Sequence, residues 1–256
     1  MTETPRLSGL RISREDMSLL IRGATIDVAP HRHHALQIAV GTAGPFQFEC
    51  RETTNMFDGI IVAPETPHRL DSLGGEVAVL LLEPELGAVR EARGRLLGDR
   101  PFAPLPAEMA DKLRALCFQK DLPSPTQALS AISTGPSSPR ALDPRIAGLQ
   151  EKLRTLPQKR VALADLAAEL GLSESRLTHL FKQETGVSLR RYMLWLRLGN
   201  AMARALSGAS LTEAAHASGF SDSAHLSRTC REMFGINPQA VARHSRFVQA
   251  DPQSNS

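Results

Sequence analysis

The chain has 256 residues, of which 42% are apolar and 22% are charged. This composition is typical of a globular protein and excludes a fully disordered chain or a fibrous repeat. The net charge of +3 is too small to indicate a partner, but it is unevenly distributed. Residues 1–140 hold 15 basic and 17 acidic side chains, whereas residues 141–256 hold 15 basic and 10 acidic ones. We therefore expect only the second half to bind a polyanion.

The cysteines and the apolar runs indicate the cellular compartment. Cys50, Cys117 and Cys230 are far apart and odd in number, which fits a reducing compartment better than a disulfide framework. The N-terminus lacks the pattern of a signal peptide, and the longest apolar run, residues 77–82, is too short to span a bilayer. We expect a soluble cytoplasmic protein with no membrane partner.

Residues 15–82 contain short apolar runs separated by Gly, Pro, Asn and Asp, a pattern that predicts an antiparallel barrel or sandwich. After Pro84 the spacing of apolar residues becomes helical. Two stripes are predicted, one of Leu86, Val89, Leu96 and Leu97 and one of Leu105, Met109, Leu113 and Leu116. Such stripes normally pack on their own domain, and a homodimer contact is the alternative.

Residues 121–141 are rich in Pro, Ser, Thr and Gly, which predicts a flexible linker. From Asp143 onward the sequence is helical in pattern. Asp143 and Pro144 are the expected N-cap and first position of a helix. Its apolar stripe consists of Ile146, Leu149, Leu153 and Leu156.

The basic half contains an internal repeat, because residues 163–188 align with residues 211–237. A small Ala (Ala167, Ala215) stands in the first helix of each copy, where two helices cross closely. One extra residue enters the second copy after the turn. Each copy predicts a helix, a tight turn and a second helix, the helix-turn-helix layout whose second helix enters the major groove of DNA.

The ends of these helices are predicted from their residue types. Gly171 and Gly219 end the first helices with positive φ. Ser173 and Ser221 are the expected N-caps of the second helices, which end at Gly186 and Gly235. Residues 188–207 predict one connecting helix about 30 Å long, which can place two recognition helices about 34 Å apart, one turn of DNA.

Residues 143–246 resemble the DNA-binding domain of the AraC/XylS family of bacterial transcription regulators. The stretch GFSDSAHLSRTCREMFGINP, residues 219–238, is similar to the signature of the family's second motif. The resemblance implies a sensor domain at 1–120, the linker at 121–141 and a DNA-binding domain at 142–248. It implies an operator in double-stranded DNA and RNA polymerase as partners, and a place at the nucleoid.

Cys230 stands where the family usually has Phe; we expect a small buried hydrophobe there, with redox sensing as the alternative.

Helix geometry and the resemblance together indicate which side chains contact DNA. Leu177, Leu180, Phe181 and Leu226 are expected to face inward. Arg228 is the strongest candidate for reading a base, because it can donate two hydrogen bonds to guanine. The predicted base-reading residues are Ser175, Thr178, His179, Ser223, Ala224, His225, Ser227 and Arg228. The predicted phosphate-binding residues are Arg176, Lys182, Arg190, Arg191 and Arg231. For each basic residue the alternative is a solvated helix face.

The first half contains a histidine cluster. On one strand His31, His33 and Gln37 would face the same side, and His68 ends another strand, whereas His34 has the opposite parity and is expected at the surface. This spacing is similar to the cupin metal motif, which implies a double-stranded β-barrel. Two departures are the amide of Gln37, where cupins commonly have Glu, and an interval before His68 that is one residue short. Three imidazoles and an amide oxygen are able to hold Zn, Ni, Fe or Cu. A metal-free effector pocket and a filled barrel interior are the alternatives.

The predicted fold class is α+β with two domains, a cupin-like barrel with trailing helices and an all-α domain with two helix-turn-helix motifs. The predicted function is a transcription regulator that responds to a small molecule or metal, and it is not an enzyme. The alternatives are a metal-dependent cupin enzyme, supported only by the histidines, and an effector-independent DNA-binding protein.

Overall fold

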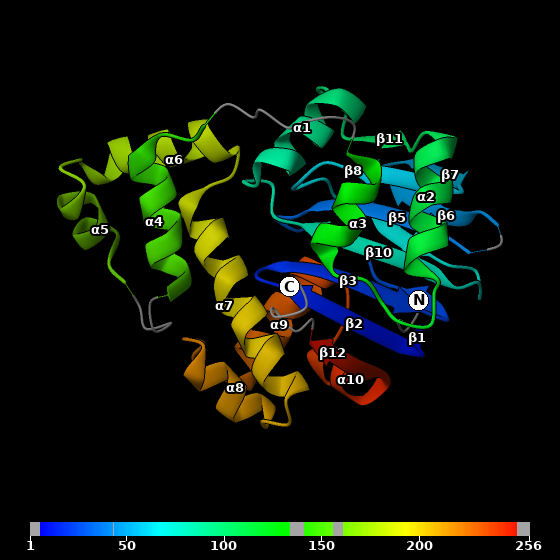
Figure 1. The fold of residues 1–256 in the computed structure, drawn as a ribbon. Coiled ribbons are helices and arrows are strands. Elements are labelled where there is room, and N and C mark those ends of the chain that lie inside the picture. The colour runs from blue at the N-terminus through cyan, green and yellow to red at the C-terminus, as the bar shows by residue number, and fades with distance from the viewer. Residues whose placement is uncertain (1–5, 43, 134–140, 156–160, 250–256) are drawn as a thin grey trace, which may run out of the picture. The chain divides into compact units, whose positions relative to one another are not determined.

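The structure, a computed structural model, describes residues 6–42, 44–133, 141–155 and 161–249. Contacts divide the chain into two units, Met1–Ser138 with Cys230–Ser256, and Pro139–Thr229. The first unit contains β-sheets with helices, and the second consists of helices (Figure 1). The predicted α+β class with two parts is therefore confirmed.

Two sheets form the first unit. Its strands are β1 (Arg6–Ser8), β2 (Leu10–Glu15), β3 (Ser18–Gly23), β4 (Thr25–Asp27), β5 (Leu36–Gly41), β6 (Phe46–Cys50), β7 (Thr53–Phe57), β8 (Gly59–Val62), β9 (Arg69–Asp71), β10 (Val77–Leu82), β11 (Phe102–Pro104) and β12 (Ser245–Gln249). One sheet has the order β1-β4-β9-β6-β7, and the other has the order β11-β8-β5-β10-β3-β2-β12. The described pairs are antiparallel, except that β12 runs parallel to β2.

The central strands β5 and β10 are buried along their whole length, because both faces of the seven-stranded sheet are covered. Side chains alternate between the two faces of a strand. Ile38 and Leu80 belong to one face and contribute to the core under the helices. Gln37 and Leu81, which pair in register, belong to the other face and line an internal cavity. Leu7, Ile26 and Leu70 line the same cavity from the five-stranded sheet, so the two sheets enclose it.

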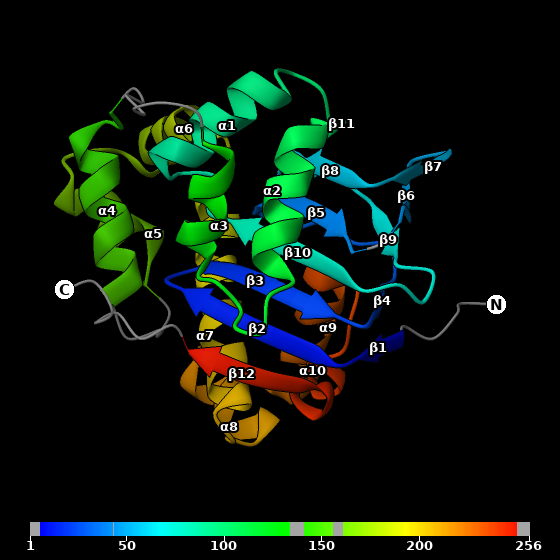
Figure 2. The same ribbon diagram turned by 45° about the vertical axis from the view of Figure 1, so that its right-hand side comes forward.

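Three helices cover the outer face of the seven-stranded sheet (Figure 2). They are α1 (Gly87–Leu96), α2 (Ala107–Cys117) and α3 (Pro125–Ile132). The two predicted apolar stripes fall on α1 and α2 and pack within this unit, with Val89 and Leu113 buried and Met109 and Leu116 partly buried. Leu86 is an exception, since it is exposed at the start of α1.

The prediction of a flexible linker over the whole of 121–141 is wrong. Ser124 caps α3 in a capping box with Gln127, and Leu129 and Ile132 are buried in the core cluster. The compositional signal failed because Ser and Pro are also the residues that start helices. Residues 134–140 of the predicted linker lie outside the described residues. The predicted domain boundaries at 120 and 142 remain predictions.

The second unit is built from helices. They are α4 (Pro144–Thr155), α5 (Leu163–Glu169), α6 (Glu174–Thr185), α7 (Leu189–Leu206), α8 (Leu211–Ala217) and the first half of α9 (Ser223–Phe234). As predicted, Asp143 caps α4 by accepting the Arg145 N–H, and Ile146, Leu149 and Leu153 are buried. Leu156 of that stripe lies outside the described residues.

The connecting helix is confirmed as α7, whose 18 residues make it about 27 Å long. Trp195 and Leu198 are buried along it. The guanidinium of Arg197 lies 6.0 Å from the centre of the Phe220 ring, so α7 contacts the turn of the second motif directly.

The sequence pattern missed four strands. β1 and most of β2 precede residue 15, β11 lies between the two predicted helical stripes, and β12 follows the last predicted helix. β12 extends the seven-stranded sheet by five register pairs with β2, from Ser245 with Leu10 to Gln249 with Arg14. Together with α10 (Pro238–His244) it belongs to the first unit, although residues up to 248 were predicted to lie in the DNA-binding domain.

The buried position of α3 leads to a stability prediction. We expect Ile132→Ala to lower the free energy of unfolding by about 2–5 kcal/mol, since it leaves a cavity in the core. Ser130→Ala, at an exposed position on the same helix, should change it by less than about 0.5 kcal/mol. Urea unfolding measures both variants, and equal values for the two would contradict the packing of α3.

Candidate DNA-binding surface and effector site

The first helix-turn-helix motif consists of α5 and α6. Gly171 takes a φ of 63° in the turn and Gly186 a φ of 81° at the end of α6, as predicted for both. The side chain of Ser173 caps α6 by accepting the Arg176 N–H at 3.2 Å. Ala167 is buried where α5 packs against α6. The sequence prediction for this motif is confirmed in its helices, turn and caps.

The second motif consists of α8 and α9, and its N-cap differs from the prediction. Asp222, not Ser221, caps α9: its Oδ1 accepts the His225 N–H at 2.6 Å. The extra residue of the second copy therefore lies before the cap, and the cap is one residue later in the chain than the repeat alignment predicts. Backbone hydrogen bonding from His225 lowers the pKa of Asp222, so the cap is ionised at neutral pH. The negative charge also stabilises the helix N-terminus.

The predicted inward residues of both recognition helices are buried, which leaves the predicted DNA-facing residues on the outer side. Leu177, Phe181 and Leu226 are fully buried. The predicted base-reading residues that are exposed are Ser175, His179, Ala224 and Arg228, and those that are partly buried are Thr178, Ser223, His225 and Ser227.

Two of these side chains are already engaged within the motif. The hydroxyl of Thr178 donates to the carbonyls of Glu174 and Ser175, which leaves its methyl group on the outer side. His225 Nδ1 lies 3.1 Å from Ser221 Oγ, and its ring packs edge-on against Phe220. His225 therefore has only Nε2 left to offer to DNA.

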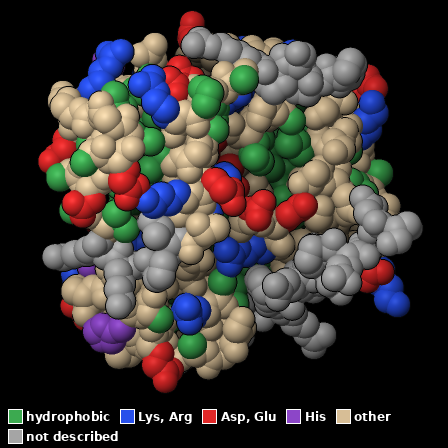
Figure 3. Space-filling model, turned by 60° about the vertical axis from the view of Figure 1, so that its left-hand side comes forward, with side chains coloured by type: hydrophobic (Ala, Val, Ile, Leu, Met, Phe, Trp, Pro, Cys, Tyr) green, Lys and Arg blue, Asp and Glu red, His purple; other side chains and the backbone are tan. Residues whose placement is uncertain are grey.

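Most of the predicted phosphate-binding residues are exposed, namely Arg176, Lys182, Arg190 and Arg231, and Arg191 is half-buried. Lys, Arg, Asp and Glu side chains are interspersed on the face that Figure 3 shows, and among the described side chains no continuous field of one sign covers that face.

The first unit brings the predicted histidine cluster together. His31 and His68 pair in an isolated β-bridge, and the ligand nitrogens of His31, His33 and His68 all lie within 4.8 Å of one another. Gln37 Oε1 lies 3.0 Å from His33 Nε2 and 3.2 Å from His68 Nε2. All four side chains are buried.

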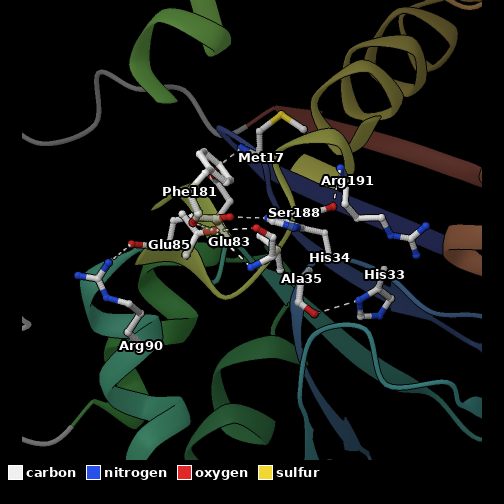
Figure 4. Close-up of polar contacts among 12 residues, drawn as sticks. Met17, His33, His34, Ala35, Glu83, Glu85, Arg90, Phe181, Ser188 and Arg191 are labelled. Atoms are coloured by element: carbon white, nitrogen blue, oxygen red, sulfur yellow. Dashed lines mark hydrogen bonds and ion pairs between the residues drawn. The ribbon is translucent and has the colours of Figure 1, made fainter. Parts of the chain in front are cut away.

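Backbone carbonyls orient the three imidazoles. Nδ1 of His31, His33 and His68 lies 2.9, 3.0 and 2.8 Å from the carbonyl two residues away, at Ala29, Ala35 and Thr66 respectively. Figure 4 shows the His33 ring turned to the Ala35 carbonyl. A carbonyl only accepts, so Nδ1 carries the proton and each Nε2 offers a lone pair. In other proteins, a hydrogen bond of this kind from one ring nitrogen orients an imidazole that binds a metal through the other nitrogen.

Charge is disfavoured in this cluster. Burial lowers the pKa of His31, His33 and His68, to about 3 for His68, and the neighbouring imidazoles lower it further for His31 and His68. Two neutral Nε2 atoms therefore face one acceptor oxygen of Gln37. This arrangement is satisfied by a cation that all three bind, or by the opposite orientation of the amide, whose two N–H groups then donate to His33 and His68.

The expectation that His34 lies at the surface is wrong. His34 is buried, and its Nε2 lies 2.6 Å from Oε1 of the equally buried Glu85 (Figure 4). The parity argument failed because strand β5 begins only at Leu36, so residues 31–35 do not alternate as a strand does.

No sequence pattern indicates that the C-terminal segment contributes to this site. Phe234, Ile236 and Val241 line the cavity beside His31 and His33. All three lie within the predicted DNA-binding domain at 142–248. Cys230, at the start of this segment, is fully buried, and burial raises the pKa of its thiol to about 12, as expected for a small buried hydrophobe.

Comparisons with known proteins agree with the helix-turn-helix geometry. The family model described as "Helix-turn-helix domain" matches residues 166–244. YidL of Escherichia coli, described as an uncharacterized HTH-type transcriptional regulator, is 34% identical over 107 residues, which are 40% of this chain and 36% of YidL. The HTH-type transcriptional activator RhaS of Pectobacterium atrosepticum is 41% identical over 87 residues, which are 34% of this chain and 31% of RhaS. The match thus spans about a third of these relatives' length.

The solved structure of unsaturated fatty acid bound ToxT from Vibrio cholerae covers 95% of this chain and 98% of ToxT, with a TM-score of 0.55 and 14% identity. This likeness shows a shared fold over both units. Among the described residues, no helix has the length and apolarity needed to cross a membrane.

Residues 166–244 therefore form a DNA-binding helix-turn-helix domain. The domain is of the AraC/XylS type, as the sequence resemblance implies, and the curated relatives that share it are named as transcriptional regulators.

The corrected cap of α9 leads to a prediction. We expect Asp222→Ala to lower the melting temperature and the operator affinity, because the His225 N–H loses its acceptor at the start of the recognition helix. Ser221→Ala keeps that acceptor and should have the smaller effect on both. Calorimetry and gel shifts at matched salt measure the pair, and a larger loss with Ser221→Ala would restore Ser221 as the cap.

Proposed function

We propose that the chain is a sequence-specific transcription regulator that binds an operator in double-stranded DNA and acts without catalysing a reaction. The observation that carries this proposal is the pair of helix-turn-helix motifs, each with a capped second helix and a solvent-facing outer side. Under this proposal Arg228 reads a base, and the exposed cations of α6, α7 and α9 bind phosphates. RNA polymerase is the expected partner at the promoter, in the cytoplasm, and homodimer formation is compatible with the same role.

The first unit is proposed to bind the effector. It contains an apolar cavity whose polar lining is the buried side chains of His31, His33 and Gln37, and a polar cluster within an apolar cavity is typical of small-molecule sites. ToxT, which shares the fold, is described as bound to an unsaturated fatty acid. Effector binding regulates DNA binding only if the effector has different affinities for the DNA-binding and non-binding states.

The base-reading role of Arg228 is tested by substitution. We expect Arg228→Ala to weaken operator binding by about 1–3 kcal/mol and to relax specificity at one operator position, because a bidentate contact is lost. Binding-site selection followed by gel shifts at fixed salt measures both effects.

Arg204→Ala provides the matched control, since Arg204 is an exposed cation in the last turn of α7, outside both recognition helices. It should leave specificity unchanged. Equal affinity of Arg228→Ala and the parent would remove Arg228 from the interface, and a parent without sequence preference would favour an effector-independent DNA-binding protein.

We also propose that His31, His33, His68 and Gln37 bind a divalent transition metal, Zn, Ni, Fe or Cu. The convergent Nε2 lone pairs and the carbonyl-bound Nδ1 atoms support this proposal. An ion bound by the three imidazoles would link residues 31–33 to residue 68, which lie on different segments of the unit. A turnover dependent on these histidines would revive the cupin-enzyme alternative.

A substitution of Gln37 distinguishes a histidine cluster that binds a metal from one that is metal-free. We expect Gln37→Glu to lower the dissociation constant for the metal, because a carboxylate replaces a neutral oxygen ligand. In a metal-free cluster the same change removes the amide N–H donors and lowers the melting temperature instead. Elemental analysis and chelator competition on untagged protein measure the metal, and calorimetry measures stability.

Gln47→Glu on strand β6 is the control for the added charge and should leave metal content unchanged. Less than about one-tenth equivalent of metal after reconstitution, with the same value for His33→Ala, would contradict the metal site.

A further inference from the structure

The C-terminal segment 232–241 packs into the first unit through a close backbone contact. The Ala29 N–H donates to the Gly235 carbonyl at 3.1 Å, and the Arg32 N–H donates to the Glu232 carbonyl at 3.3 Å. A Cβ at Gly235 would lie 2.2 Å from the Ala29 oxygen, and the backbone there has a φ of 67°. A side chain at this position would therefore force the segment away from Ala29.

The same segment closes the apolar cavity. Phe234, Ile236 and Val241 form its wall on the segment's side, and the remaining lining comes from the two sheets. The cavity has a volume of about 70 Å³. Small-molecule sites usually measure about 300–1,000 Å³, so an effector of ordinary size does not fit while this wall is in place.

The wall on β10 is fixed more firmly than the segment. Val79 and Leu81 lie on β10, which pairs along its length with β3 and β5. Moving them would break two ladders of backbone hydrogen bonds. The segment between Glu232 and Val241 is joined to residues 29–32 by the two backbone hydrogen bonds described above. An incoming ligand therefore displaces the segment more easily than the β10 wall.

We propose that segment 232–241 is an internal ligand of this cavity, and that the effector is a small amphipathic molecule that displaces it. The lining sets the chemistry: aliphatic side chains from both sheets surround the ligand's body, and in the metal-free cluster the Nε2 lone pairs of His31 and His33 accept a hydrogen bond from a hydroxyl at its single polar end. The displacement specifies the class of effector for the proposed function, and its effect on DNA binding rests on that proposed function. Phe234 ends α9, and α9 is continuous back to Ser223, so displacement of its last turn moves the helix that carries Arg228.

The test uses the full chain, with decan-1-ol as the amphipathic probe, because its hydroxyl can donate to an imidazole Nε2. Hydrogen exchange at the Ala29 and Arg32 amides reports whether the segment is docked, and the Ala24 amide, which donates to Ser8 in the same unit, is the internal reference. We expect decan-1-ol to raise exchange at Ala29 and Arg32 by at least about fivefold and to leave Ala24 unchanged.

Gly235→Ala should release the segment without ligand. Its expected results are fast exchange at Ala29 and Arg32 and an affinity for decan-1-ol at least about fivefold higher by calorimetry, since the competing segment is gone. Gly171→Ala is the matched control, because Gly171 has a similar φ of 63° but open space around its Cβ position. It carries the same backbone strain and should leave both readouts at parental values.

Decan-1-ol that binds the parent without raising exchange at Ala29 and Arg32 would overturn the proposal, as would decan-1-ol that binds neither the parent nor Gly235→Ala. Binding to Gly235→Ala alone supports it, because the segment then outcompetes the probe in the parent. Operator affinity is measured separately: decan-1-ol should change it in the parent and not in Gly235→Ala. A parent that binds no specific DNA would contradict the proposed function, and the exchange result would still test whether the probe displaces the segment.

Discussion

The alternation of side chains along β5 and β10 is the constraint on which the first unit depends. One face of these strands packs under α1, α2 and α3, and the other lines the cavity. The register that pairs Gln37 with Leu81 places the only polar side chain of β5 on the cavity face. A shift of one residue would bury Gln37 under the helices and turn Ile38 to the histidines. Both the core and the candidate site therefore follow from one register.

The cavity and the histidine cluster form a single chemical environment. Burial keeps the imidazoles neutral, the backbone carbonyls fix their orientation, and their remaining lone pairs converge on Gln37. Such a cluster is suited to neutral hydrogen bonding or to a metal, and unsuited to holding an unpaired charge. Because the C-terminal segment completes the wall, the residue that ends the recognition helix, Phe234, borders this environment.

The DNA-binding motifs were predictable because local rules decide them. Positive φ at Gly171 and Gly219, the Ser173 cap and the inward leucines all depend on residues within one or two turns. The local error in these motifs is the cap of α9. The repeat alignment matched Ser221 with the Ser173 cap, whereas the structure shows that Asp222 occupies the capping position. Composition misled at 121–141, where Leu129 and Ile132 are buried by tertiary contacts that a Pro- and Ser-rich pattern does not reveal.

The sequence by itself determined the fold class, the duplicated helix-turn-helix motif and the four side chains of the histidine cluster, because each is written in residue spacing. Only the tertiary structure decided that His34 is buried with Glu85, that the imidazole lone pairs converge, and that β12 and Phe234 belong with the sheets. These features join residues far apart in the chain, by about 200 positions in the case of Ala29 and Gly235. The free energy of such contacts comes from burial and backbone pairing across the fold, which no local pattern encodes.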